Sequence, residues 1–366
     1  MEPNFTFNML WGLLAAALIS RIAIPPVVRV ARKKQLVALP NGRTSHNGAV
    51  PALGGVAIFA AVSIATSLFL ENGIPREFQF TFPALLMIFM IGMKDDLVNL
   101  TAHTRLIAQI LAGLLIVVFA DIRVASFYGI FGLWELSYPV SLIFSLIVFV
   151  GLVNAFNLID GIDGLASGLG IQISLVFGIW LAMIGHTNYA TLAFALTGAL
   201  IPFYIFNVFG KKYKLFMGDT GSLLLGTIFA TLSIKILCCP LADGHILQMT
   251  ALPAVVIASM IIPIADTLKV FTIRISKGQS PFYADRNHLH HDLIRMGLTH
   301  WQASTLIILA NFMIFLFAMA FRNIHPLMLC VMVAFLGAVA VMVPRFFYPV
   351  SEQKRPKRPS KVAYAK

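Results

Sequence analysis

The segment PVSLIFSLIVFVGLVNAFNLIDGIDGLASG, residues 139–168, decides the fold class because it joins an apolar stretch to a run of polar side chains. Its first part continues an apolar stretch that is long enough to cross the hydrocarbon core of a bilayer, which takes about 20 residues. Its second part carries polar side chains at every third position: Asn154, Asn157, Asp160 and Asp163. Near a helix end this spacing predicts one shared face. Such oxygen ligands suit Mg²⁺, whereas a capping turn with Asx hydrogen bonds is the purely structural alternative.

Further apolar stretches lie on both sides of this segment and predict an all-α polytopic membrane protein with about eleven transmembrane helices. The chain is 59% hydrophobic and only 11% charged, against roughly 25% charged residues in a typical soluble domain. This composition excludes soluble globular, disordered, collagen-like and disulfide-scaffold proteins. The predicted spans are residues 5–24, 51–70, 79–93, 105–121, 137–155, 164–184, 188–208, 221–238, 250–268, 301–320 and 326–346.

The distribution of charge predicts the orientation of the chain. We expect one integral-membrane domain over residues 1–346, with cytoplasmic active-site loops, and a basic cytoplasmic tail over residues 347–366. The net charge is +12, and most of the 27 Lys and Arg residues fall on one face of the predicted layout. Because such residues are enriched in cytoplasmic loops, the N-terminus is predicted outside and the C-terminus inside. On the outer face we expect an interfacial hairpin over residues 122–136 and a Lys235 side chain that extends to the interface.

Three further polar motifs lie on the predicted cytoplasmic face. Lys94-Asp95-Asp96 follows the third span. Its two adjacent carboxylates indicate a metal-associated or general-base pair, and a solvated helix end is the structural alternative. In FMGDTGS, residues 216–222, an Asp flanked by glycines opens a span, where it is a cation ligand or an ordinary N-cap. DRNHLHH, residues 285–291, favours phosphate binding over zinc, because no Cys accompanies its closely spaced histidines.

Together these motifs predict phosphoryl transfer at a membrane surface. Acids that suit Mg²⁺ and cations that suit a diphosphate indicate a water-soluble nucleotide diphosphate and a lipid whose head group reaches the same plane. A transporter or flippase is the alternative from a different functional class. Transporters usually place their polar sites near the bilayer midplane, whereas these acids lie at span ends. The deepest exception, Asp266, is expected near the cytoplasmic end behind the site.

These motifs resemble those of the polyprenyl-phosphate N-acetylhexosamine-1-phosphate transferase family. The stretches that carry the resemblance are MKDD at 93–96, NAFNLIDGIDGLASG at 154–168, FMGDTGS at 216–222 and DRNHLHH at 285–291. RTSHNGAVPALGG at 43–55 also looks like the first cytoplasmic loop of the family. The chain is most similar to the bacterial undecaprenyl-phosphate GlcNAc-1-phosphate transferases of the WecA/TagO type. It lacks the PxHHHFE-like stretch of the MurNAc-pentapeptide translocase branch.

The resemblance implies a role for each matching residue. Asp219 is expected to be the principal Mg²⁺ ligand, with Asn157 nearby and Mn²⁺ as a possible substitute. Asp95 is the expected base toward the lipid phosphate, and Asp96 is expected to support the metal and phosphates. Lys94 and Arg105 are weaker candidates for binding the lipid phosphate. The nucleotide or its diphosphate is expected to meet Asn154, Asp160, Asp163, Asn207, Phe216, Arg286, His288 and His290.

The implied reaction transfers GlcNAc-1-phosphate from UDP-GlcNAc to undecaprenyl phosphate and releases UMP. It is the first membrane step of a cell-surface polysaccharide pathway, such as O-antigen or teichoic acid synthesis, in the bacterial cytoplasmic membrane. Several alternatives stay open. These are another UDP-N-acetylhexosamine as donor, a covalent two-step mechanism through Asp95 or Asp96, and a homodimer, which small residues such as Ala15 and Ala16 permit. No nucleic-acid partner is expected.

Overall fold

The structure is a computed structural model that describes residues 7–36, 50–71, 73–238, 249–280 and 287–347. Within these ranges the chain is helical and forms no strand beyond one isolated antiparallel bridge between Ser126 and Glu135. The predicted all-α class is therefore confirmed. The α-helices are α1 (Phe7–Lys33), α2 (Gly54–Leu68), α3 (Phe78–Val98), α4 (Ala102–Leu114), α5 (Tyr138–Ile159), α6 (Leu165–Met183), α7 (Thr187–Val208), α8 (Gly218–Leu237), α9 (Leu252–Ser259), α10 (Ile261–Ser276), α11 (Leu289–Arg295), α12 (His300–Ala320) and α13 (Pro326–Phe347).

The helices identify a multi-pass membrane protein. Eight helices in the described part of the chain are long and apolar enough to cross a membrane, and the bent pair α9 and α10 would make nine. Each of the eleven predicted stretches coincides with a helix or with this bent pair. However, α2 has only 15 residues, and α3 ends in Lys94-Asp95-Asp96. The predicted number of eleven spans therefore stays a prediction.

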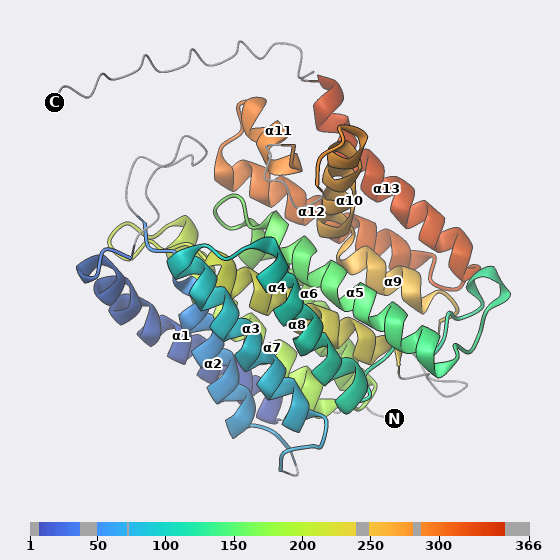
Figure 1. Cartoon of the computed structure of the whole chain (residues 1–366), viewed down its shortest axis with the longest axis horizontal. Helices are drawn as coiled ribbons and strands as arrows, with labels where there is room; N and C mark the ends of the chain where they lie inside the picture. Colours follow the sequence, from blue (N-terminus) through green and yellow to red (C-terminus); the bar gives the residue numbers. More distant parts are fainter. Residues whose placement is uncertain (1–6, 37–49, 72, 239–248, 281–286, 348–366) are drawn as a thin grey trace.

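Helix α8 is the central element of the bundle, and α2, α3, α5 and α6 pack around it. Figure 1 shows α1 and α2 toward one side of the bundle and α9, α10 and α13 toward the other. Helix α3 can approach α8 this closely because Gly92 has no side chain. A Cβ at this position would lie 2.6 Å from the Cα of Thr220. The small residues of α1 pack against α7, where the Ser20 hydroxyl donates to the carbonyl of Ala199 (2.8 Å).

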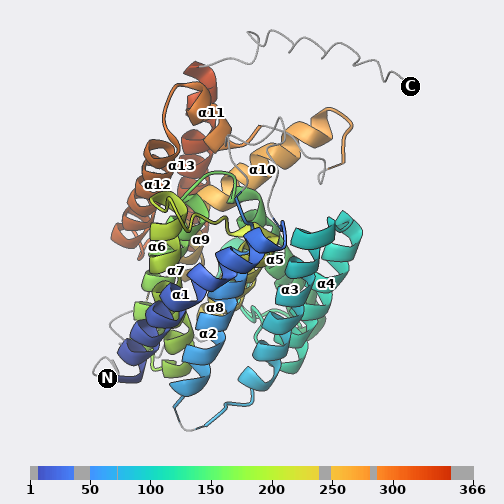
Figure 2. The same ribbon diagram turned by 90° about the vertical axis from the view of Figure 1, so that its left-hand side faces the viewer.

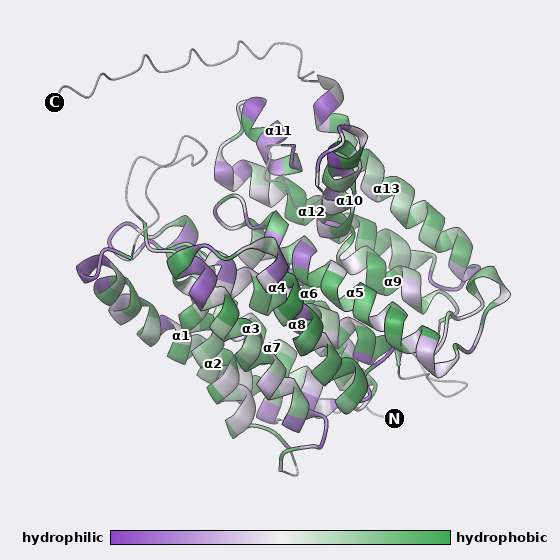
Figure 3. Cartoon of the chain, viewed as in Figure 1, coloured by the Kyte–Doolittle hydropathy of each residue, from purple (hydrophilic) through white to green (hydrophobic). Residues whose placement is uncertain are grey.

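One end of the bundle, which we call the site end, gathers the polar motifs. The last turns of α3, α5 and α7 meet the first turns of α4, α6 and α8 there. Hydrophilic residues concentrate at this end in Figure 3, including those of α11 and the beginning of α4. The start of α2 joins it through two hydrogen bonds, from Gly54 N to the Phe216 carbonyl and from Gly55 N to the Met217 carbonyl (both 2.9 Å).

The predicted ninth span is broken rather than straight. Helices α9 and α10 meet at Met260 and bend by 77°, so that α10 projects from the bundle in Figure 2. The fully buried side chain of Asn311 in α12 forms hydrogen bonds with two backbone groups at the break. Its amide oxygen accepts from Ile262 N (3.1 Å), and its amide nitrogen donates to the Ser259 carbonyl (2.7 Å).

At the opposite end, the expectation for Lys235 is wrong. Lys235 is only 6% exposed and donates to both carboxylate oxygens of Glu77 (2.8 and 3.0 Å) while lying over the ring of Tyr189. It therefore ties α8 to the beginning of α3 instead of extending to the interface. The hairpin predicted over residues 122–136 is present, with Phe127 N donating to the Trp134 carbonyl (2.9 Å) and Phe131 and Trp134 exposed.

Candidate functional site

The carboxylate of Asp96 anchors the beginning of α8. It accepts hydrogen bonds from Asp219 N (2.7 Å), Thr220 N (3.0 Å) and the Thr220 hydroxyl. Backbone amides at a helix start are otherwise unpaired, so an acceptor here stabilises the turn. Gly218 begins this turn with φ of +73°, and a Cβ at this position would overlap the Ala52 carbonyl and lie 2.7 Å from Asp96. Asp96 therefore fixes where Asp219 lies.

Asp219 is the point at which three helices converge. Its Oδ1 accepts from the Asn157 amide nitrogen (2.7 Å) and lies 3.7 Å from Arg105 Nη1. Arg105 also forms an ion pair with Asp95 (3.1 Å), which is buried and accepts from Leu100 N as well. One guanidinium thus lies between two carboxylates. The Asp219 side chain keeps 35% of its surface exposed, so it remains accessible to a ligand.

The loop between α5 and α6 places two further acids beside this cluster. Asp160 is partly exposed, yet desolvation, together with the charges of Asp219, Asp96 and Asp163, raises its pKa to about 7. Asp163 is buried, accepts from Lys214 Nζ (2.7 Å) and lies 3.6 Å from His300 Nδ1. The loop therefore places two acids on this side of Asp219, and one of them, Asp163, is already paired with Lys214.

Asn207 holds this loop in place. Its amide oxygen accepts from Gly164 N (2.7 Å), and its amide nitrogen donates to the Leu215 carbonyl (2.9 Å). The side chain is 5% exposed. Both ends of the amide thus join the loop of Asp163 to the segment before α8. Phe216, in that segment, is half-buried, and its backbone pairs with Pro51 and Gly54.

The histidines of the fourth motif reach the same loop from α11. The ring of His290 lies against Gly161, where a Cβ would overlap its Nε2 atom. Burial and the neighbouring His291 lower the pKa of His290 well below its usual value. His288 stacks on His290 with ring centroids 5.6 Å apart. Arg286, the remaining residue predicted in this motif, lies outside the described residues.

The structure places Asn154 apart from the other predicted nucleotide-binding residues. Its amide nitrogen donates to Gln109 Oε1 (2.7 Å) and to the Val150 carbonyl (2.8 Å). Its side chain lines an apolar groove of about 1060 Å³. The four polar residues at every third position thus do not share one face, because α5 ends at Ile159 and the two acids lie in the following loop.

The groove runs along α5 and away from the carboxylates. It is bounded by α4, α8, α9, α10 and the hairpin at the opposite end, and its walls are almost entirely apolar. Ile147, Leu268 and Phe131 line it and are largely exposed. The groove therefore opens sideways from the bundle, and Asn154 lies where it approaches the site end.

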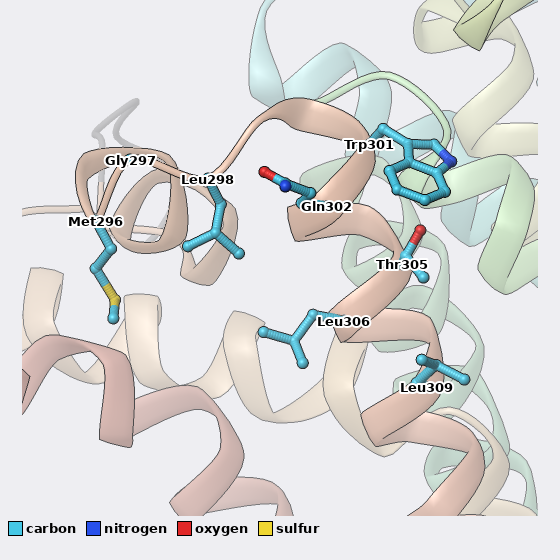
Figure 4. A pocket seen from close by; sticks show the side chains of 8 residues that line it. All are labelled: Met296, Gly297, Leu298, Trp301, Gln302, Thr305, Leu306 and Leu309. Atoms are coloured by element: carbon cyan, nitrogen blue, oxygen red, sulfur yellow. The ribbon is translucent and has the colours of Figure 1, made fainter.

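A second cavity, of about 450 Å³, lies between α11 and α12 and is shown in Figure 4. Met296, Leu298, Trp301 and Leu306 line it, and none of its lining residues is charged. It therefore does not belong to the carboxylate cluster. Lys94, a weaker candidate from the sequence, is exposed on α3 beside the buried Asp95.

Comparison with known proteins identifies the family of the chain. The model of glycosyl transferase family 4 matches residues 78–237. Undecaprenyl-phosphate alpha-N-acetylglucosaminyl 1-phosphate transferase of Escherichia coli (strain K12) is 34% identical over 285 residues, which cover 77% of this chain and 75% of that protein. The chain belongs to glycosyl transferase family 4.

Other members show the same likeness. The protein of the same name from Yersinia pestis is 35% identical over 77% of this chain and 76% of its own length. Decaprenyl-phosphate N-acetylglucosaminephosphotransferase of Mycobacterium tuberculosis (strain CDC 1551 / Oshkosh) is 31% identical over 320 residues, 81% of this chain and 78% of that protein. The segment matched by the family 4 model contains Asp95, Asp96, Asn157, Asp160 and Asp219, whereas α11 lies beyond it.

The residues of this family 4 site fit a magnesium ion. Mg²⁺ is usually held by one or two carboxylates together with waters and substrate phosphates. Asp219 offers an accessible carboxylate, because 35% of its side-chain surface is exposed. Among the described residues, no group of three or more His, Cys, Asp or Glu side chains forms a complete metal cage. Asn157 turns its amide nitrogen toward Asp219, so its oxygen would face an ion there only after rotation of the amide.

Sequence reasoning missed several residues that shape the site. Gln109 holds Asn154, Thr220 donates to Asp96, and Ser222 accepts from Asn157 (3.0 Å). Lys214, which precedes the FMGDTGS motif, neutralises Asp163. Thr220 and Ser222 do fall inside the FMGDTGS motif, but Gln109 has no local sequence signal because its partner is 45 residues away.

Proposed function

We propose that this protein transfers GlcNAc-1-phosphate from UDP-GlcNAc to undecaprenyl phosphate, forming undecaprenyl-diphosphate-GlcNAc and releasing UMP. The names of its relatives in glycosyl transferase family 4 support this reaction. The observation that carries the proposal lies on α5, where Asn154 lines the apolar groove and Asn157, one turn further along, donates to Asp219 of the carboxylate cluster. A lipid acceptor and a charged donor need these two environments side by side.

In the proposed reaction, an oxygen of the lipid phosphate attacks the β-phosphorus of the donor. The bond between that phosphorus and the bridging oxygen breaks, and UMP leaves with the oxygen. Asp219, with Asn157 nearby, would hold Mg²⁺, which would neutralise charge on the diphosphate when bound. Asp95 accepts the proton of the lipid phosphate, and Arg105, between Asp95 and Asp219, binds that phosphate. Catalysis of this kind depends mainly on positioning and electrostatics.

The donor occupies the side of the site formed by the loop of Asp160 and Asp163. Phe216 lies against the base, and Arg286, His288 and His290 bind the diphosphate or sugar. Contact between His290 and Gly161 supports this arrangement, since it brings α11 to that loop. Asn207 acts by holding the loop, because both ends of its amide are already bonded to the backbone.

The acceptor chain occupies the apolar groove, which opens toward hydrocarbon. We further propose eleven spans, with the N-terminus outside and the site end facing the cytoplasm of a bacterium. The excess of Lys and Arg on the predicted inner face supports this orientation. A cytoplasmic site is also where a nucleotide-linked sugar is available.

The decisive experiment measures UMP release by purified protein in the presence of Mg²⁺, undecaprenyl phosphate and a panel of UDP-N-acetylhexosamines. We expect release with UDP-GlcNAc, loss of release after chelation of Mg²⁺, and loss in Asp219→Asn. The matched control is Asp121→Asn, an exposed acid at the opposite end that pairs only locally with Arg123, and it should retain activity.

Other outcomes would change the proposal. Absence of UMP release with every donor in the panel contradicts a phosphotransferase, and lipid-linked flux in proteoliposomes without UMP release favours a transporter. Exchange of UMP into the donor without any lipid acceptor supports a covalent two-step mechanism. Strict dependence on the lipid supports direct attack.

A further inference from the structure

A buried ion network lies behind the histidines of α11. Asp266 of α10 is 1% exposed. Its Oδ2 lies 2.9 Å from His288 Nδ1, and its Oδ1 accepts from Leu289 N (2.8 Å) and Lys269 Nζ (2.9 Å). One carboxylate thus binds both the ring and the following backbone amide. These contacts hold the start of α11 against α10.

The chemistry of this contact determines which ring nitrogen of His288 carries a proton. An ionised carboxylate only accepts hydrogen bonds, so His288 Nδ1 must donate to it. Lys269, which pairs with the same carboxylate, favours the ionised form. Nε2 is then the ring nitrogen of His288 left for another partner. The alternative tautomer, with hydrogen on Nε2 alone, would place two acceptors against each other in a buried site.

We propose that Asp266 is a positioning residue that keeps the proton of His288 on Nδ1 and thereby presents Nε2 to the sugar diphosphate. This inference rests on the proposed function, in which His288 meets the donor. Asp266 itself touches His288, Leu289 and Lys269, not the carboxylate cluster. It therefore acts through His288.

The position of α11 relative to the acidic loop supports this role. His288 stacks on His290, and His290 contacts Gly161 in the loop that carries Asp160. Lys269 extends the network away from the site, donating to the Val341 carbonyl of α13 (3.3 Å) and lying 3.8 Å from Asp292. The network thus joins the donor-side histidines to α13.

The first test observes the tautomer directly. Nitrogen NMR of protein labelled at its histidine rings, with His288 assigned by its disappearance in His288→Gln, should show a protonated Nδ1 in the wild type. In Asp266→Asn the amide can donate to the ring, so we expect Nδ1 to lose its proton. An unprotonated Nδ1 in the wild type overturns the proposal, even if the variant cannot be purified.

The second test compares UMP release in matched variants. Asp266→Asn should lower kcat/KM by about tenfold or more, as expected when the carboxylate that orients a histidine is lost. Asp292→Asn is the control, because it removes a buried carboxylate that contacts the same Lys269 and also Arg295, but not the His288 ring. It should stay within about threefold of the wild type.

A double variant separates positioning from general stability. If Asp266 acts through His288, then adding Asp266→Asn to His288→Gln should cause no further loss of kcat/KM. Independent, multiplying losses overturn the proposal, as does equal damage by Asp292→Asn. Failure of the proposed function itself would appear differently, as absence of UMP release by the wild-type protein.

Discussion

The acids of the site differ in what their neighbours allow them to do. Both carboxylate oxygens of Asp96 accept hydrogen bonds from the start of α8. Asp95 is buried, where it pairs with Arg105 and accepts from Leu100 N. Asp219 alone among these three side chains combines a large exposed surface with a position between helices. Because an ion or a phosphate needs an accessible ligand, Asp219 is the residue whose loss should remove metal binding most directly.

Gly218 offers a sharp test of how the start of α8 is built. In Gly218→Ala, the positive φ costs about 1–2 kcal/mol, and the new Cβ would also displace the Ala52 carbonyl or the Asp96 carboxylate. We expect a lower melting temperature and more than about tenfold less UMP release, since misplacement of Asp219 weakens positioning. Thermal unfolding in detergent and the UMP assay measure both effects.

Gly278→Ala is the matched control for this variant. Gly278 also has a positive φ, of +65°, but nothing lies within 4 Å of a Cβ built there. It should therefore lose only the backbone contribution, about 1–2 kcal/mol, and keep its activity. Equal losses in the two variants would mean that φ strain, and not the contact with Asp96, explains the effect at Gly218.

Single residues could be predicted from the sequence where the motif itself carries the contact. Asp95, Asp96 and Asp219 stand in such motifs, although the hydrogen bonds of Asp96 to Thr220 and of Asn157 to Asp219 join different helices. The one-face interpretation of residues 154–163 was wrong for a physical reason: α5 ends at Ile159, so Asp160 and Asp163 leave the helical spacing. The role of Gln109 depends on packing between α4 and α5, which spacing within either helix does not show.

Among the elements, the bent pair α9 and α10 forms one wall of the groove. Residues of both helices line it, including Val256 and Ile257 before the bend and Ile264 and Leu268 after it. A straight helix would satisfy its own backbone, but a bend frees backbone groups in a region without water. Asn311 supplies these groups with partners.

We therefore expect Asn311→Leu to destabilise the bend. The variant removes two hydrogen bonds and leaves Ile262 N and the Ser259 carbonyl buried, at a cost of about 1–3 kcal/mol. Apparent stability in detergent should fall, and KM for undecaprenyl phosphate should rise more than KM for UDP-GlcNAc. Ser304→Ala is the control on the same helix, because its buried hydroxyl donates only to the Trp301 carbonyl one turn before it.

Elements were predictable to the extent that hydrophobic length specifies them. The stretch over residues 250–268 reads as one span, because its apolar composition is continuous across Met260. The partner that makes the bend tolerable, Asn311, is about 50 residues away, so no local pattern reveals it. The same holds for the buried Lys235, whose partner Glu77 lies at the start of the distant helix α3.

At the scale of the whole molecule, the site has two approaches of different polarity. The loops of the site end carry Asp160, Lys214 and the histidines, whereas the groove is lined by apolar side chains down to the hairpin at the opposite end. Each substrate would thus use its own approach and meet the other at Asn154 and Asp219. A change in the groove should affect one substrate and spare the other.

Gly151→Leu tests this separation. Gly151 lines the groove, and nothing lies within 4 Å of a Cβ built there. A leucine would occupy space for about two methylenes of a bound chain, each worth about 0.8 kcal/mol, so KM for undecaprenyl phosphate should rise about tenfold. KM for UDP-GlcNAc should not change.

Two comparisons make this result specific. Gly151→Ala should give a smaller rise in the acceptor KM, because it adds one methyl group. Val339→Leu, at an exposed position of α13 away from the groove, should leave both KM values as they are. A rise in the donor KM alone for Gly151→Leu would contradict the placement of the lipid chain in the groove.

The sideways opening of the groove also determines which concentration of the acceptor controls the rate. A lipid that enters from the bilayer diffuses in two dimensions, so its effective concentration is its mole fraction among the surrounding lipids. Adding inert phospholipid at a fixed total amount of acceptor would slow turnover by surface dilution, although nothing in the water phase had changed. The rate depends on the donor through its ordinary concentration in water. The composition of the membrane therefore changes the rate through the acceptor only.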